Sequence, residues 1–240
     1  MKSAFAVSTL LLLSLSSNLR SEEKARPKPQ APSGPSKPLA AKGELLFEDH
    51  FDRDTLGDWK PVIPGFKVTD GVLVGTQDKA DHGAVGRVYR PMKDVVVEFR
   101  FRLEGSPRFN VVFDDQKHKG SHAGHICRIA FTPNGIRLGD DKEGIMRNDI
   151  FEARRDPARK EAADEQVKDR ASWSPLKIEQ QKWYAVAIEL VGDRMRVSLD
   201  GKPVGYLKSP GLAHETKTSF HFTVSGKAIY FDDVGIWKAK

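Results

Sequence analysis

The chain has 240 residues, of which 39% are hydrophobic, a formal net charge of +6 at pH 7 and a single cysteine, Cys127. An internal disulfide is therefore excluded, so the fold must be held by its own core. Residues 1–42 hold seven Lys/Arg and two Asp/Glu, which leaves 32 Lys/Arg against 31 Asp/Glu in the remainder. Because this part is nearly neutral, we do not expect it to bind nucleic acid.

Residues 1–21 have the features of a signal peptide. Lys2 precedes an apolar run from Ala4 to Leu15, and small residues suited to signal-peptidase cleavage follow. This run is shorter than the roughly 20 residues that a transmembrane helix needs. We expect a secreted or periplasmic protein with no membrane span once the leader is cleaved.

Residues 22–42 are rich in proline and lysine. Five closely spaced prolines prevent both helix and sheet, which predicts a disordered tether. The remaining stretch, 43–240, is about 200 residues long and suits one domain with a full-sized core.

Within 43–240 the hydrophobic pattern has a period of two. From Val95 to Leu103 every second residue is apolar and most of the others are charged, as in a strand that covers a core on one side. The alternation recurs around 185–190, 195–199, 220–224 and 229–231. Hairpin turns are indicated by Asp70-Gly71, Asn134-Gly135, Gly192-Asp193 and Asp200-Gly201. The pattern predicts an all-β, antiparallel fold.

One segment departs from this pattern. Asp156 and Pro157 are typical of a helix N-cap and first turn, and the residues up to Arg170 favour helix without a broad apolar stripe. We expect one inserted surface helix near 157–170, which is either a solvated excursion or a lid over a binding face.

Three stretches resemble a known family: Leu46–Arg53 with Trp59, Phe66–Leu73, and Ile229–Trp237. Together they resemble the concanavalin A-like lectin/glucanase jelly rolls, and in particular the bacterial 3-keto-disaccharide hydrolase family, which is related to family 16 glycoside hydrolases. The resemblance implies a jelly-roll sandwich of two antiparallel sheets, adjacent first and last strands, and a concave face that binds sugar.

The chain lacks the Glu-x-Asp-x-(x)-Glu strand of retaining family 16 glucanases, which places two carboxylates about 5 Å apart on one face. The nearest candidates, Asp149 and Glu152, are three residues apart and would lie on opposite faces of a strand. Ordinary glucanase chemistry is therefore not expected.

The segment 113–152 is the richest in reactive side chains. In one interpretation His122 or His125 is a general acid or base that Asp114 or Asp115 orients, and Asp141 is a further catalytic candidate. In a second, His118, His122 and a carboxylate bind a transition metal. In a third, these are polar loop residues that only make local hydrogen bonds.

Four residues are candidates for substrate binding. Arg128 and Lys142 would bind a sugar oxygen or a developing oxyanion, and Glu152 belongs to the same polar segment. Trp173 follows the predicted helix and either stacks on a sugar or packs that helix onto the sandwich.

Carboxylates at both ends of the domain, among them Asp49 and Asp233, would converge if the first and last strands pair. Clustered oxygens suit a structural calcium ion, the one cofactor we consider; the alternative is that these residues cap turns or face water.

We expect an exported carbohydrate-active protein that hydrolyses a keto-glycoside on the concave face. The alternative is a non-catalytic carbohydrate-binding or surface-attachment module of the same fold, because the fold does not decide between them.

Overall fold

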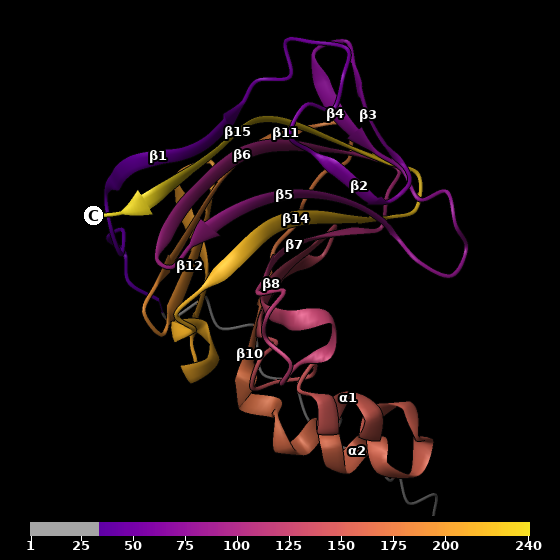
Figure 1. Cartoon of the computed structure of the whole chain (residues 1–240), viewed down its shortest axis with the longest axis vertical. Coiled ribbons are helices and arrows are strands. Elements are labelled where there is room, and N and C mark those ends of the chain that lie inside the picture. Colours follow the sequence, from indigo (N-terminus) through magenta and orange to yellow (C-terminus); the bar gives the residue numbers. More distant parts are fainter. Residues whose placement is uncertain (1–33) are drawn as a thin grey trace, which may run out of the picture.

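The computed structural model describes residues 34–240, which form two antiparallel β-sheets stacked face to face (Figure 1). The predicted leader and the first part of the predicted tether lie outside the described residues. The all-β jelly-roll sandwich is confirmed, and β1 (Lys42–Asp49) pairs with β15 (Ala228–Ala239), so the first and last strands are adjacent as expected. None of the helices in 34–240 is long and apolar enough to cross a membrane.

One sheet, which we call the convex sheet, contains β1, β15 and six further strands. These six are β3 (Phe66–Thr69), β4 (Val72–Gly75), β6 (Val95–Glu104), β11 (Trp183–Val191), β12 (Arg194–Leu199) and β13 (Lys202–Lys208). Their order is β13-β12-β11-β6-β15-β4-β3, with β1 added alongside β15.

The other sheet, which we call the concave sheet, contains the remaining strands. They are β2 (Lys60–Ile63), β5 (Ala84–Met92), β7 (Arg108–Asp114), β8 (His125–Thr132), β9 (Gly135–Asp140), β10 (Ala171–Pro175) and β14 (Lys217–Ser225). Their order across the sheet is β10-β9-β8-β7-β14-β5-β2.

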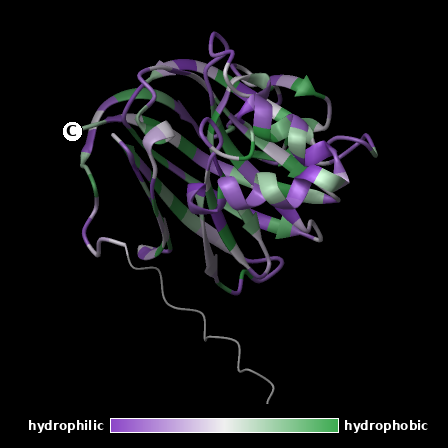
Figure 2. Cartoon of the chain, turned by 90° about the horizontal axis from the view of Figure 1, so that it is seen from below, coloured by the Kyte–Doolittle hydropathy of each residue, from purple (hydrophilic) through white to green (hydrophobic). Residues whose placement is uncertain are grey.

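The core lies between the sheets and follows the predicted alternation, which Figure 2 shows as hydrophobic and hydrophilic residues alternating along the strands. Five alternate side chains of β6 are at most 2% exposed: Val95, Val97, Phe99, Phe101 and Leu103. Across the layers, Phe222 of β14 stacks on Phe231 of β15 with ring centroids 3.9 Å apart. Burial of each such ring stabilises the folded state by about 1.5–3 kcal/mol, so the packing of the interior can hold the fold together without a disulfide.

The predicted turns are confirmed by the strand pairing. Asp70-Gly71 joins β3 to β4, and Asp200-Gly201 joins β12 to β13. Both residues of each turn have positive φ, between 48° and 74°, as two-residue hairpins require.

The insertion contains two α-helices instead of one. α1 (Asn148–Arg155) precedes α2 (Pro157–Gln166), and Asp156 caps α2 by accepting a hydrogen bond from the Ala158 amide at 2.9 Å. The cap was predicted, but α2 ends at Gln166, and a short 3-10 turn (Lys168–Arg170) follows. Asp149 and Glu152 therefore lie on a helix, where the strand argument does not apply. α1 was missed because it lacks a side-chain N-cap.

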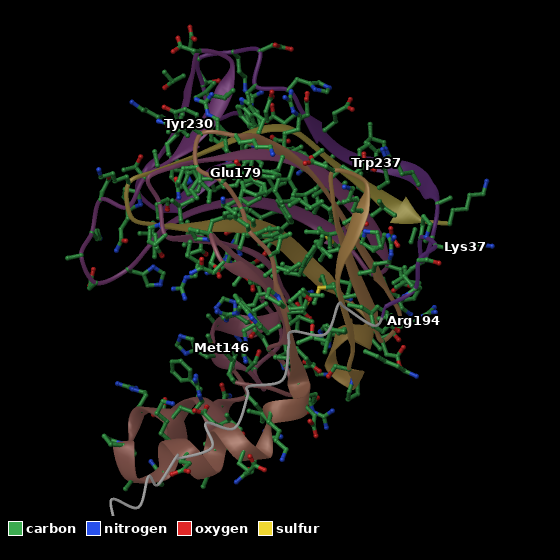
Figure 3. All side chains as sticks on the ribbon, turned by 180° about the vertical axis from the view of Figure 1, so that it is seen from behind. Lys37, Met146, Glu179, Arg194, Tyr230 and Trp237 are labelled. Atoms are coloured by element: carbon green, nitrogen blue, oxygen red, sulfur yellow. The ribbon has the colours of Figure 1, made fainter. Side chains whose placement is uncertain are left out.

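Residues 34–41 lie against the outer face of the convex sheet (Figure 3). Glu189 of β11 and Arg196 of β12 form a buried cross-strand ion pair there, with Nη1 and Oε1 2.7 Å apart. Arg196 also donates to the carbonyl oxygens of Pro35 at 3.0 Å and Ser36 at 3.2 Å. The Leu39 amide donates to Glu189. These contacts place the end of the proline-rich segment on the folded domain.

Removing residues 1–41 would take away these three hydrogen bonds and open the Glu189–Arg196 pair to water. We expect the free energy of unfolding, measured by urea denaturation, to fall by about 1–3 kcal/mol because hydrogen bonds to buried charged groups are lost. A chain that lacks only residues 1–33 is the matched control, since it keeps the contacts. Equal stability of the two shortened chains would contradict this prediction.

Candidate active site

A cleft of about 550 Å³ lies on the open face of the concave sheet. Loop residues from 81–83 and 122–123 and part of α1 form its walls. Six polar side chains that line it are Arg87, Asn110, His122, His125, Arg128 and His221. Strand alternation explains Arg87, Asn110, Arg128 and His221, because positions that alternate with core residues must point to the open face.

Three of these residues come from one row across the sheet. Arg87 of β5 lies opposite His221 of β14, His221 lies opposite Val112 of β7, and Val112 lies opposite Arg128 of β8. Neighbouring strands are about 4.8 Å apart, so the row spans roughly 14 Å. Residues that are distant in sequence therefore meet on one surface.

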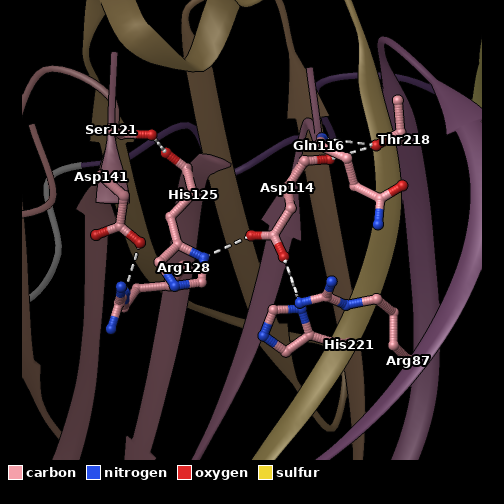
Figure 4. A network of polar contacts seen from close by, with 9 residues as sticks. All are labelled: Arg87, Asp114, Gln116, Ser121, His125, Arg128, Asp141, Thr218 and His221. Carbon is pink, nitrogen blue, oxygen red and sulfur yellow. Dashed lines mark hydrogen bonds and ion pairs between the residues drawn. The ribbon is translucent and has the colours of Figure 1, made fainter. Parts of the chain in front are cut away.

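Asp114, at the end of β7, lies beneath this surface and is fully buried (Figure 4). His125 Nδ1 lies 2.6 Å from its Oδ1, and Arg87 Nη2 donates to Oδ2 at 2.9 Å. His221 Nδ1 is 3.1 Å from Oδ2, although off the direction of a good hydrogen bond. Burial alone would raise the pKa of Asp114, but the hydrogen bonds and charges of the two histidines outweigh it and hold this pKa well below its ordinary value.

The ionised Asp114 fixes the tautomer of His125. A carboxylate can only accept hydrogen bonds, so the proton of neutral His125 lies on Nδ1 and Nε2 carries a free lone pair. Since His125 lines the cleft, this lone pair belongs to an accessible imidazole that a buried carboxylate holds in place. The pair is arranged as a general base with its orienting acid group.

A β-bulge brings His125 to this position. Phe113 of β7 pairs with Cys127, but the next residue, Asp114, pairs with His125, so Ile126 is an extra residue in β8. Regular alternation would turn His125 into the core together with Cys127. The bulge reverses the alternation, so that His125 and Arg128 reach the same face.

Arg128 is held by a second buried carboxylate. Its Nε lies 2.5 Å from Asp141 Oδ2, and Asp141 is fully buried. Arg128 Nη2 has no hydrogen-bond partner among residues 34–240, although it is buried. Asp141 therefore fixes the guanidinium in place, while the partly exposed side chain of Arg128 still lines the cleft.

His122 lies on the loop between β7 and β8. Its ring stacks on Phe151 of α1 with centroids 3.9 Å apart, and its amide donates to the Met146 carbonyl at 2.7 Å. Desolvation and then the charge of His125 lower the pKa of His122. The neutral imidazole of His122 thus lies beside that of His125, and the two ring centroids are 6.3 Å apart.

The structure brings His122, His125 and Arg128 together, with Asp114 and Asp141 directly beneath. It does not place Lys142 or Glu152 among the cleft residues: Lys142 pairs with Glu143, and Glu152 pairs with Arg155 on the exposed side of α1. Trp173 lies farther away, on the edge strand β10.

The metal predictions gain no geometric support. Within residues 34–240 no three His, Cys, Asp or Glu side chains are arranged to hold a metal ion. Asp49 accepts hydrogen bonds from Arg53, Trp59 Nε1 and the Phe51 amide, and Asp233 lies 2.9 Å from His50 Nδ1. Their oxygens are thus engaged with protein donors, and calcium binding stays a prediction.

Sequence reasoning missed Arg87 and His221. A weak signal was present, because both alternate with core residues: Phe220 and Phe222 flank His221, and Gly86 and Val88 flank Arg87. Only the register between β5, β14 and β7 brings both side chains to Asp114.

The chain matches no family model and no curated protein. Its fold is similar to that of SCLam, a non-specific endo-β-1,3(4)-glucanase from family GH16, with a TM-score of 0.59 and 12% identity over 88% of this chain and 98% of the glucanase. It is also similar to the carbohydrate-binding module CBM66 from Bacillus subtilis, with a TM-score of 0.50 and 14% identity over 78% of this chain and 98% of the module.

A sialidase is similar with a TM-score of 0.57 and 14% identity over 83% of this chain, which spans only 19% of the sialidase. At these identities the similarities establish the fold alone, a concanavalin A-like jelly roll.

Burial lowers the pKa of His221, so the folded protein takes up its proton at a lower pH than the unfolded chain, where histidine titrates near 6.5. The unfolded state binds more protons between these two values, so this group's contribution to stability is complete above about pH 6.5 and is lost as the pH falls below it. We expect His221→Gln to reduce the loss of unfolding free energy between pH 7.5 and 5.5, measured by urea denaturation at each pH. The exposed His82→Gln is the control, and an unchanged pH dependence in His221→Gln would contradict the prediction.

Proposed function

We propose that the protein is a carbohydrate-active enzyme that cleaves a glycoside with a keto group on its sugar ring. In this reaction His125 removes a proton from the carbon next to the keto group. The observation that carries the proposal is the 2.6 Å contact between His125 Nδ1 and the buried, ionised Asp114. The family resemblance of the sequence and the fold of the glucanase and the binding module support a sugar as the ligand.

The carboxylates of the site are unsuited to ordinary glycoside hydrolysis. That reaction needs a protonated carboxylic acid and a second free carboxylate beside the sugar. Asp114 is buried and ionised, and Asp141 is buried against Arg128, so neither is available to protonate a leaving group. Apart from Asp81 on the wall loop, the ionisable groups that line the cleft are imidazoles and guanidinium groups.

A histidine base is strong enough only for an acidified C–H bond, such as one beside a ketone. We propose that His125 Nε2 removes the proton at C2 of a 3-keto sugar while Arg128 stabilises the enolate oxygen at C3. The enolate then expels the alcohol at C1, which takes up the proton that His125 removed from C2, while neutral His122 donates a hydrogen bond to the leaving oxygen. Water adds across the resulting C1–C2 double bond, so the net change is hydrolysis.

His125→Ala and Asp114→Asn should each lower kcat on a 3-keto disaccharide by roughly 10²–10⁴-fold, because one removes the base and the other its orientation. The assay compares the purified full chain and both variants on ordinary and 3-keto disaccharides. His50→Ala, directly after β1 and outside the cleft, is the matched control.

If His125→Ala turns over the substrate at the normal rate, His125 is not the base. If the unchanged chain binds these sugars but cleaves none of them, the non-catalytic binding module is the correct function.

We also propose that the protein is exported. The apolar run and small residues of 1–21 support this. Expressed in a bacterium, the protein should be found outside the cytoplasm with an N-terminus near residue 22, as measured by mass spectrometry of the intact chain. A full-length cytoplasmic chain would contradict the proposal.

A further inference from the structure

Trp173 is one of the few large hydrophobic side chains that the structure leaves open, with 52% of its surface exposed. It lies on β10 at the edge of the concave sheet, opposite Arg137 of β9. Arg137 lies opposite Ala130 of β8, and Ala130 lies opposite Asn110, which lines the cleft. Because paired residues share a face, the indole stands on the same face of the sheet as the cleft.

The indole lies close to the backbone of Gly135. A Cβ atom on Gly135 would lie 2.6 Å from Cζ2 of Trp173, so the absence of a side chain at this glycine leaves room for the ring. Packing of the helical insertion does not account for the ring, because the small core of that insertion consists of Ile150, Ala163 and Val167 with Ile145 and Ala153. Part of the indole thus contacts the sheet and the remainder is exposed.

Trp173 lies far from His125, the residue at which we place the reaction. Ala130, in the row of Trp173, is five residues from His125 along β8, which is roughly 16 Å at about 3.3 Å per residue. Trp173 is two strands farther across, about 10 Å, so the two residues are roughly 19 Å apart. A two-ring substrate with its scissile bond at His125 does not reach that far.

Arg137 of β9 lies between Trp173 and Ala130 on the open face, and its guanidinium can donate hydrogen bonds to hydroxyl or carboxylate oxygens of a sugar chain. Asn110 and the exposed Arg108 of β7 line the end of the cleft that is remote from His125. The row of residues that begins at Trp173 thus reaches the cleft at Asn110.

We propose that Trp173 is a distal subsite that stacks on a sugar ring of the same substrate, so that the substrate is an oligosaccharide longer than a disaccharide. This inference rests on the proposed function. The apolar face of a sugar ring fits an exposed indole, and the polar edges of the ring remain free for Arg137 and water.

The test is isothermal titration of the full-length His125→Ala chain with β-1,3- and β-1,4-linked gluco-oligosaccharides of two to six rings. Affinity should rise once the chain is long enough to reach β10. Adding Trp173→Ala should lower the affinity for the long oligosaccharides by about three- to tenfold and leave the disaccharide unchanged. Trp173→Phe should restore part of the loss, and Leu45→Ala, an exposed residue of the convex sheet, is the matched control.

Equal affinity for two and six rings, or no effect of Trp173→Ala on the long ones, would overturn this inference and leave the proposed function standing. Absence of binding by every oligosaccharide would overturn this inference as well. Turnover of a 3-keto disaccharide by the unchanged chain tests the chemistry separately.

Discussion

The site depends on one constraint, the two-sidedness of the strands in the concave sheet. β7 is the clearest case: Phe113 is buried between the sheets, and the next residue, Asp114, belongs to the opposite side. The core aromatics must face inward because their burial stabilises a fold that has no disulfide. The residues between them have no other place than the open face, so the packing that stabilises the sandwich also builds the cleft.

The second constraint is electrostatic. Asp114 and Asp141 are buried in the floor of the cleft, where an unpaired carboxylate would be strongly destabilising. The negative charge of each is compensated by a side chain that reaches the cleft: Arg87 and His125 contact Asp114, and Arg128 contacts Asp141. The same contacts that neutralise the floor orient the groups that face the cleft. This favours base catalysis with oxyanion stabilisation over chemistry by two free carboxylates.

The sequence predicted the sandwich well because alternation and turn residues are local signals, as at Val95–Leu103 and Asp200-Gly201. It also pointed to His125 and Asp114, since reactive residues were dense in that segment. It did not predict His221, because only strand register brings β14 beside β7. Nor does alternation distinguish the two faces at a strand end: Trp183, the first residue of β11, is half-buried on the convex sheet, where Arg100 and Arg102 lie over its ring.

The bulge in β8 shows most clearly why local patterns are insufficient. With regular pairing, Ile126 would face the cleft and His125 would be buried beside Cys127. The extra residue at Ile126 exchanges these positions, and Ile126 becomes fully buried. Its carbonyl accepts hydrogen bonds from the Asp141 and Lys142 amides, so the irregularity is itself fixed by the strand that carries the second buried carboxylate. The bulge thus couples the positions of His125 and Asp141. His125 is the proposed base, and Asp141 holds Arg128, which we propose stabilises the enolate oxygen.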